Sequence, residues 1–256
     1  MELEKYIKTR LEKKDILLMT HIVLGYPSLD DSYRIIKTMV EAGVDIMELQ
    51  IPFSEPTADG PVIVKANQHS LDNGTTVEAC LDLAGRAAKD FDIPFLLMTY
   101  YNIPYNYGIN RFTEKMAESS LKGTIIPDLP PEEGDDFLKS MKDKSLDPVL
   151  IFSPATSDER MEYLGAYASG FIYCVARKGV TGKDTNFSED LTKYLNRCRK
   201  ATSLPLALGF GIKQKSDVDF LKGKVDIAVV GTQSIKVMDE SGIDAVGEFI
   251  RELQGE

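Results

Sequence analysis

The sequence predicts an α/β protein that folds as a (β/α)8 TIM barrel. Short β-rich apolar runs alternate with amphipathic helical stretches along nearly the whole chain, which is the pattern of βαβ units that build a parallel sheet. Eight such units can be read, and the length of 256 residues is close to the roughly 250 typical of this barrel. No linker-like stretch divides them, so residues 1–256 are predicted to form a single domain.

The elements follow from the hydrophobic periodicity. Short apolar runs rich in β-branched residues are predicted as strands at Leu17–Leu24, Val44–Ile51, Ile93–Thr99, Gly123–Pro127, Asp147–Phe152, Gly170–Val175, Leu204–Leu208 and Val225–Val230. Helical periodicity predicts helices at Asp31–Ala42, Val77–Phe91, Arg111–Ser119, Pro131–Lys142, Ser157–Ala168, Glu189–Ala201, Lys213–Leu221 and Gly242–Leu253. Two further helices are extras to the barrel: an N-terminal one at Glu2–Lys13 and one after the second strand at Pro61–Asp72.

The first strand-to-helix loop argues against an open sheet. Its residues, Gly25-Tyr26-Pro27-Ser28, lack the Gly-x-Gly-x-x-Gly pattern that opens a dinucleotide-binding sheet. Eight units in a chain of this length also favour a closed barrel over an open doubly wound sheet. A flavodoxin-like or Rossmann fold is the alternative.

The composition is that of an ordinary globular protein, with 27% charged and 43% hydrophobic residues. The net charge of −10 and the lack of a basic run argue against sequence-independent binding of nucleic acid, because no cluster of cations is present to neutralise phosphates. The N-terminal residues have no apolar signal-peptide core, and the apolar runs are too short to span a bilayer. We therefore expect a cytoplasmic protein that binds neither nucleic acid nor a membrane.

The cysteines and histidines show no metal-binding pattern. Cys80, Cys174 and Cys198 are widely spaced without a Cys-x-x-Cys pair, and His21 and His69 add no ligand spacing. We expect no metal site and interpret the thiols as small core residues.

Glu48 is a candidate functional residue because it interrupts an apolar strand pattern. A buried carboxylate is costly unless it is paired or useful, and burial raises its pKa. The alternation of a strand places Ile46, Glu48 and Gln50 on one face, and the apolar residues between them suit the helix layer. Glu48 is thus predicted to point into the barrel mouth and to give and take protons there. The alternative is a buried acid paired to a lysine or a backbone amide.

The loop after this strand carries Glu55 and a second candidate, Asp59, directly before Gly60-Pro61. Two acids in one pocket can hold different protonation states and divide acid and base duties. The alternative is that Asp59 is simply the N-cap of the following helix, a common role for Asp in front of Pro.

Glycine-bearing junctions follow the seventh and eighth strands, at Gly209-Phe210-Gly211 and Gly231-Thr232, and each leads into a helix. Barrels often bind phosphate there through backbone amides and a helix N-terminus, so a phosphate site is predicted, with tight turns as the alternative. After the sixth strand, the polar residues 176–184 are typical of a mobile lid or of a plain solvated loop.

Five segments match one known family: Leu24–Ser28, Glu48–Pro61, Pro127–Glu133, Gly179–Gly182 and Gly209–Ile212. Through them the chain resembles the α subunits of tryptophan synthase, from about Met19 to Lys236. The resemblance implies a (β/α)8 barrel that cleaves indole-3-glycerol phosphate to indole and glyceraldehyde 3-phosphate, without a metal or cofactor in this chain. It also implies an αββα tetramer, in which a β subunit with pyridoxal phosphate takes up the indole.

The resemblance also implies roles for single residues. Glu48 matches the family's acid and base, and Asp59 matches the carboxylate that holds the indole nitrogen. Thr181 is expected to hydrogen-bond Asp59 when the lid closes. The other matched positions are Tyr173 near Glu48, Thr181 and Gly182 in the lid, Gly182, Gly211, Gly231 and Thr232 around the phosphate, Phe210, Tyr100 and Ile125 around the indole, and His21 where the family often has an apolar aromatic.

The chain departs from the family pattern at several positions. Gln50 stands where the family generally has glycine, on the Glu48 face, and is expected either to crowd the pocket or to hydrogen-bond the catalytic carboxylate. Thr232 stands for the usual serine. Glu55 replaces an aspartate, and Asn102-Ile103-Pro104 replaces a more usual Asn-Pro order, in loops by which the family docks its β subunit.

Several functions compete. The leading one is a lyase coupled to a β subunit. One alternative is a stand-alone indole-3-glycerol-phosphate lyase, motivated by Gln50 and the altered loops. Another is a largely silent regulatory subunit that binds glycerol phosphates, against which the intact Glu48 and Asp59 argue. A different phosphate-binding barrel enzyme, such as a sugar-phosphate isomerase, is the last.

Overall fold

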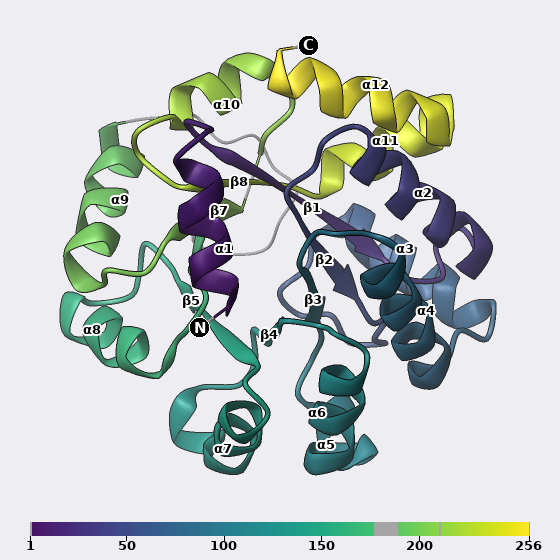
Figure 1. Ribbon diagram of the computed structural model, residues 1–256, viewed down its shortest axis with the longest axis horizontal. Coiled ribbons are helices and arrows are strands. Elements are labelled where there is room, and N and C mark those ends of the chain that lie inside the picture. The colour runs from purple at the N-terminus through teal and green to yellow at the C-terminus, as the bar shows by residue number, and fades with distance from the viewer. Residues whose placement is uncertain (1, 177–188, 210, 256) are drawn as a thin grey trace.

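The computed structural model describes residues 2–176, 189–209 and 211–255, which form a barrel surrounded by helices (Figure 1). Its eight parallel strands pair in chain order, and β8 pairs with β1, so the sheet is closed. This confirms the predicted fold class and rules out an open sheet, in which the two edge strands would lack a partner. The strands are β1 (Leu17–Val23), β2 (Ile46–Gln50), β3 (Phe95–Met98), β4 (Gly123–Ile125), β5 (Asp147–Phe152), β6 (Ile172–Val175), β7 (Leu206–Gly209) and β8 (Ile227–Val230).

The helices cover the outside of the barrel, except for α1, which lies across one end (Figure 1). Their bounds are α1 (Glu2–Leu11), α2 (Leu29–Glu41), α3 (Pro61–Asp72), α4 (Val77–Asp90), α5 (Asn102–Tyr107), α6 (Ile109–Glu118), η1 (Pro131–Glu133, a 3₁₀ turn), α7 (Asp135–Asp143), α8 (Asp158–Tyr167), α9 (Glu189–Ala201), α10 (Lys215–Leu221), α11 (Thr232–Ser241) and α12 (Ile243–Gln254). The predicted extras correspond to α1 and α3.

Three regions differ from the elements expected from sequence. The short helix α5 is absent from the elements expected from sequence; its Pro104 is tolerated because it lies within the first turn. One helix was expected at the C-terminal end, but the structure has α11 and α12, divided at Gly242 with φ 87°. The helix expected at Pro131–Lys142 is divided at Gly134 into η1 and α7.

The predicted alternation on β2 is confirmed. Met47 and Leu49 pack in the apolar layer between barrel and helices, and Ile46 packs inside the barrel. The interior is filled by large side chains from several strands, among them Met19 and Leu96. The middle of the barrel is therefore a packed core, which leaves space for a ligand toward its ends.

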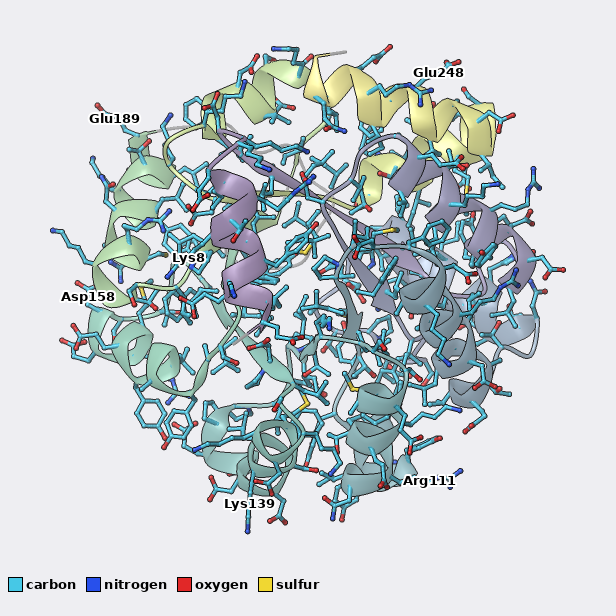
Figure 2. The ribbon with its side chains drawn as sticks, viewed as in Figure 1. Lys8, Arg111, Lys139, Asp158, Glu189 and Glu248 are labelled. Atoms are coloured by element: carbon cyan, nitrogen blue, oxygen red, sulfur yellow. The ribbon has the colours of Figure 1, made fainter. Side chains whose placement is uncertain are left out.

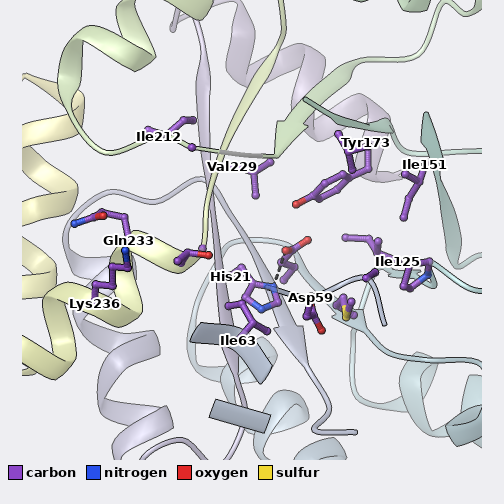
Figure 3. Close-up of a pocket in the computed structure, with 18 of the residues that line it drawn as sticks. His21, Asp59, Ile63, Ile125, Ile151, Tyr173, Ile212, Val229, Gln233 and Lys236 are labelled. Carbon is purple, nitrogen blue, oxygen red and sulfur yellow. Dashed lines mark hydrogen bonds and ion pairs between the residues drawn. The ribbon is translucent and has the colours of Figure 1, made fainter. Parts of the chain in front are cut away.

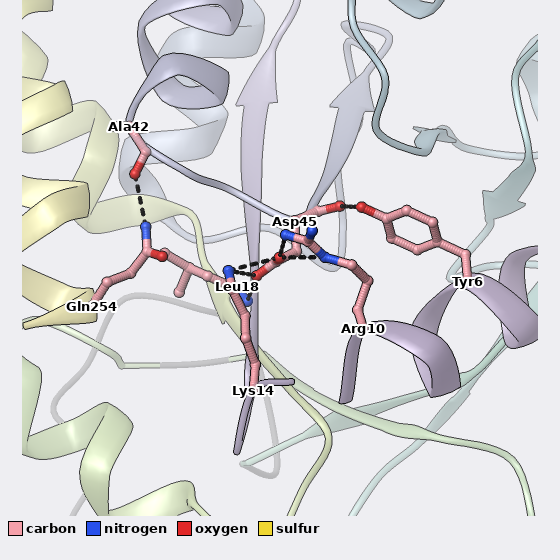
Figure 4. Close-up of polar contacts among 7 residues, drawn as sticks. All are labelled: Tyr6, Arg10, Lys14, Leu18, Ala42, Asp45 and Gln254. Atoms are coloured by element: carbon pink, nitrogen blue, oxygen red, sulfur yellow. Dashed lines mark hydrogen bonds and ion pairs between the residues drawn. The ribbon is translucent and has the colours of Figure 1, made fainter. Parts of the chain in front are cut away.

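One end of the barrel is closed by α1, which is fastened through Asp45 (Figure 4). The buried carboxylate of Asp45 accepts hydrogen bonds from Arg10 Nη2 at 2.6 Å, Lys14 Nζ at 2.8 Å and the Leu18 N–H at 3.0 Å. The Tyr6 hydroxyl donates to the Asp45 carbonyl oxygen at 3.0 Å. Because Leu18 and Asp45 lie where β1 and β2 begin, α1 covers the N-terminal end of the barrel and leaves the C-terminal end open.

Charged side chains such as Lys8, Arg111, Lys139, Asp158, Glu189 and Glu248 lie on the exposed faces of the helices (Figure 2). Within the described ranges, no helix is long and apolar enough to cross a membrane.

Candidate active site

A cavity of about 700 Å³ opens at the C-terminal ends of the strands (Figure 3). The residues on its wall come from all eight strands or the loops and helices that follow them. They are His21, Glu48, Ala58, Asp59, Ile63, Met98, Ile125, Pro127, Ile151, Tyr173, Val175, Gly211, Ile212, Lys213, Val229, Gly231, Thr232, Gln233 and Lys236. The middle of the wall is mostly aliphatic, so the cavity suits a flat apolar group with a polar end.

Glu48 lies on this wall and is 3% exposed. Its Oε1 atom lies 2.7 Å from His21 Nδ1 on the neighbouring strand β1, where His21 and Glu48 are register partners. Among the described residues, the partner of Glu48 is therefore a histidine and not the lysine or backbone amide of the alternative. Burial lowers the pKa of His21, but Glu48, Asp59 and Gln50 together outweigh that effect and raise it above the ordinary value.

Asp59 lies on the same wall and is held by two donors. Gln50 Nε2 donates to its Oδ2 atom at 2.8 Å, and the Tyr100 hydroxyl donates to the same oxygen at 3.0 Å. Burial raises the pKa of Asp59 above its ordinary value, against the opposing effects of His21, Gln50 and Tyr100. The N-cap of α3 is Gly60, without a side-chain cap, so the alternative that Asp59 only caps that helix is wrong.

The loop that carries Asp59 is tied to the barrel at two points. The Ala58 N–H donates to the Tyr100 hydroxyl at 3.0 Å, and the Phe53 N–H donates to Asn67 Oδ1 at 2.8 Å. Phe53 and Tyr100 also stack, with ring centroids 5.1 Å apart. Asp59 is thus positioned by the loop that follows β3 and by α3 as well as by its own loop.

Tyr173 of β6 lines the cavity and faces the two acids. Burial, together with Glu48 and Asp59, holds the pKa of its hydroxyl well above the ordinary value, so the group stays protonated. Its ring lies directly against Gly209 on β7, where an added Cβ would come within 2.4 Å of the Tyr173 hydroxyl oxygen. Gly209 is therefore required by this close approach.

The other end of the cavity has the features of an anion site. Gly231 is the N-cap of α11, and Thr232 and Gln233 begin that helix, whose first N–H groups and dipole favour a negative charge. Gly211 lies opposite on the turn after β7, with φ 80°. Lys236, one turn into α11, adds a positive charge on the wall.

The structure brings most of the expected site residues together. Glu48, Asp59, His21, Tyr173, Ile125, Gly211, Gly231 and Thr232 all line one cavity. Tyr100 is not on its wall: it is 1% exposed and lies behind Asp59, which it holds. Thr181, Gly182 and Phe210, with the expected lid, fall outside the described residues. In the described part of the chain, no cluster of His, Cys, Asp or Glu could hold a metal ion.

Several wall residues were missed by the sequence reasoning. Lys213, Gln233 and Lys236 follow the glycine junctions. They could have been predicted by including in the candidate site the roughly four residues after each junction, which is one helical turn. Ile63 was missed because the wall it forms depends on where α3 packs, and the periodicity of a helix does not contain that information.

Comparison with known proteins identifies the family of this chain. The family model described as "Tryptophan synthase alpha chain" matches residues 7–253. The tryptophan synthase alpha chains of Desulforapulum autotrophicum and Syntrophotalea carbinolica are 59% and 58% identical over 251 and 252 residues, which cover 98% of this chain and 99% and 100% of theirs. A solved chain of Mycobacterium tuberculosis tryptophan synthase superposes with a TM-score of 0.93 at 26% identity, covering 99% of this chain and 96% of that one. A solved Aquifex aeolicus chain gives 0.91 at 31% identity, covering 99% and 97%. The chain belongs to the tryptophan synthase alpha chain family.

Proposed function

We propose that this chain is the lyase subunit of a cytoplasmic tryptophan synthase. It cleaves indole-3-glycerol phosphate to indole and glyceraldehyde 3-phosphate and passes the indole to a β subunit that carries pyridoxal phosphate, in an αββα tetramer. The observation that carries the proposal is that Glu48, Asp59 and the N-terminus of α11 lie on one cavity in a chain of this family. This chain needs no cofactor of its own, because a retro-aldol cleavage is acid–base chemistry.

Glu48 is proposed as the acid and base. Protonation of indole C3 makes an indolenine, in which the ring nitrogen is electron-poor. Removal of the proton from the side-chain hydroxyl then forms the aldehyde carbonyl, breaks the carbon–carbon bond and returns the electron pair to the indole ring. One proton enters at C3 and one leaves the hydroxyl, so a single carboxyl group can serve both steps.

Asp59 is proposed to stabilise the charge that develops on the indole ring. The indolenine N–H is a strong donor, and a fixed carboxylate aimed at it favours the intermediate over the ground state. Gln50 and Tyr100 hold Asp59 before the substrate arrives, so little reorganisation is required. The aliphatic wall formed by Ile125 and its neighbours suits the face of the indole ring.

The phosphate of the substrate is proposed to bind at Gly211, Gly231 and Thr232. Backbone N–H groups at a helix N-terminus bind phosphate without a buried counter-charge. A threonine in place of serine at position 232 keeps the same N–H. Thr181 and Gly182 are proposed to complete the site from the lid, and Phe210 to cover the indole.

The first test is the release of indole from indole-3-glycerol phosphate by the purified chain, with and without an added β subunit. Slow release that rises strongly with the partner supports a coupled synthase subunit. Fast release that ignores the partner would favour the stand-alone lyase, and no release in either condition would contradict the proposal.

Glu48→Gln tests the mechanism itself. The substitution keeps the shape of the side chain and removes proton transfer, so kcat should fall by about 10²–10⁴-fold while the circular dichroism spectrum stays unchanged. Glu55→Gln is the matched control, because Glu55 is exposed on the loop after the same strand. Near-wild-type turnover of Glu48→Gln would refute the role of Glu48.

A further inference from the structure

The contact between His21 and Glu48 is a feature of the cavity that the chemistry above does not use. Its two atoms lie 2.7 Å apart, His21 is 6% exposed and Glu48 is 3% exposed (Figure 3). Glu48 Oε2 and His21 Nε2 are both buried and have no hydrogen-bond partner among the described residues. The contact between His21 Nδ1 and Glu48 Oε1 is thus the hydrogen bond that joins the two side chains.

A histidine that serves only to fill space would be a poor choice at this position. Its Nε2 atom has no partner within the described ranges, and a buried polar atom without a partner is costly. An apolar ring would fill the same volume without that cost. The imidazole is therefore explained by its contact with Glu48 and not by packing.

We propose that His21 is a positioning residue for Glu48: Nδ1–H binds Oε1 and orients the carboxyl group so that Oε2 exchanges the proton with the substrate. The inference rests on the proposed role of Glu48 as acid and base. When Glu48 gives its proton to indole C3, the carboxylate that remains is stabilised by the imidazole N–H. When Glu48 takes the hydroxyl proton, the same hydrogen bond keeps Oε1 occupied, so only Oε2 reacts.

Other ionisable side chains line the cavity around His21 and Glu48. Asp59 and Tyr173 face it from the loop after β2 and from β6, and Lys213 and Lys236 lie on the wall at the phosphate end. Tyr100 lies behind Asp59. Asp59 adds negative charge and so favours a protonated imidazole, as Glu48 does more strongly. The titration of His21 therefore reports mainly on its nearest charge, Glu48.

The contact can be tested without measuring activity, because the chain has two histidines in all. In ¹⁵N-histidine NMR spectra, His69→Gln removes the second imidazole and leaves resonances from His21 alone. Adding Glu48→Gln to that background should lower the titration midpoint of His21, because the neutral amide no longer favours the imidazolium. An unchanged midpoint would overturn the inference, whether or not the protein cleaves indole-3-glycerol phosphate.

Kinetics then separate positioning from packing. His21→Phe should lower kcat by about tenfold or more, because it removes a hydrogen bond to a charged group. His21→Asn offers an amide N–H in place of Nδ1–H and should recover most of kcat. If both variants keep the wild-type kcat, His21 is only a packing residue and the inference is wrong.

Discussion

At the scale of single residues, Gln50 at the end of β2 hydrogen-bonds Asp59 on the loop that follows this strand. Gln50 is fully buried, and its amide holds the Asp59 carboxylate from the strand that also carries Glu48. The sequence placed Gln50 on the Glu48 face and predicted that its side chain either crowds the pocket or hydrogen-bonds the catalytic carboxylate of Glu48. Its actual partner is Asp59, because the loop folds back over the strand end, a feature that strand alternation does not encode.

Gln50→Met should therefore weaken catalysis at low pH. Methionine keeps the length of the side chain but has no donor, so the pKa of Asp59 should rise further and the acid limb of the kcat/KM profile should move to higher pH. On the acid side kcat/KM should fall about tenfold, as expected for a hydrogen bond to a charged group. Gln68→Met, an exposed glutamine on α3, is the control. An acid limb that stays in place would show that Gln50 does not act through Asp59.

At the scale of elements, α1 is held to the barrel mainly by buried contacts. Leu3 and Ile7 pack against the barrel interior, and the Asp45 carboxylate joins α1 to the start of β1 (Figure 4). The sequence predicted α1 as an extra helix from its amphipathic pattern. Its position at the N-terminal end of the barrel could not be predicted. The sequence does not show that Arg10, Lys14 and the Leu18 N–H all contact Asp45.

Asp45→Ala should lower the free energy of unfolding by about 2–3 kcal/mol, since the buried Leu18 N–H loses its acceptor and the charge-assisted bonds are lost. Arg10 and Lys14 are partly exposed and can turn to solvent, which limits the loss. Urea unfolding followed by circular dichroism measures the change. Glu4→Ala is the control, because it breaks the exposed pair with Lys8 on the same helix and should cost less than about 1 kcal/mol. Equal losses for Asp45→Ala and Glu4→Ala would mean that the Asp45 contacts contribute little.

A substitution at the N-terminus of α11 should weaken substrate binding without lowering the stability of the protein. Gln233→Glu places a carboxylate at the second position of the helix, where the dipole favours it by about 0.3–1 kcal/mol. The same charge repels a phosphate, so KM for indole-3-glycerol phosphate should rise about tenfold or more while the melting temperature stays the same or increases. Gln233→Ala should change KM little. If KM is the same for both variants, the phosphate does not bind near Gln233.

At the scale of the whole molecule, two ionisable groups of the buried site should make the free energy of unfolding fall as the pH rises. The pKa values of Asp59 and His21 are both raised in the folded protein, so the folded state binds more protons than the unfolded state above the ordinary values of 3.8 and 6.5. The contribution of each group to the free energy of unfolding is fully present below its ordinary pKa. It is lost as the pH rises through the pKa that the group has in the folded protein. The resting protein should therefore become less stable through the neutral range.

His21→Asn isolates the contribution of His21. Above pH 6.5 the free energy of unfolding of the wild type should decline more steeply than that of the variant, by up to about 1.4 kcal/mol per pH unit for one proton. Urea unfolding of both proteins at a series of pH values from 6 to 9 measures the two slopes. Parallel curves would show that the pKa of His21 is the same in the folded and unfolded states.

The sequence by itself determined the barrel, the inward direction of Glu48 and the glycine junctions, because each follows from local periodicity, chain length or turn chemistry. Only the tertiary structure decided which polar groups meet. It paired His21 with Glu48 across β1 and β2, Gln50 with Asp59 beneath a folded loop, and placed Tyr100 behind the wall. Closing a barrel sets the register between strands distant in sequence, and such contacts depend on packing that a local pattern does not contain.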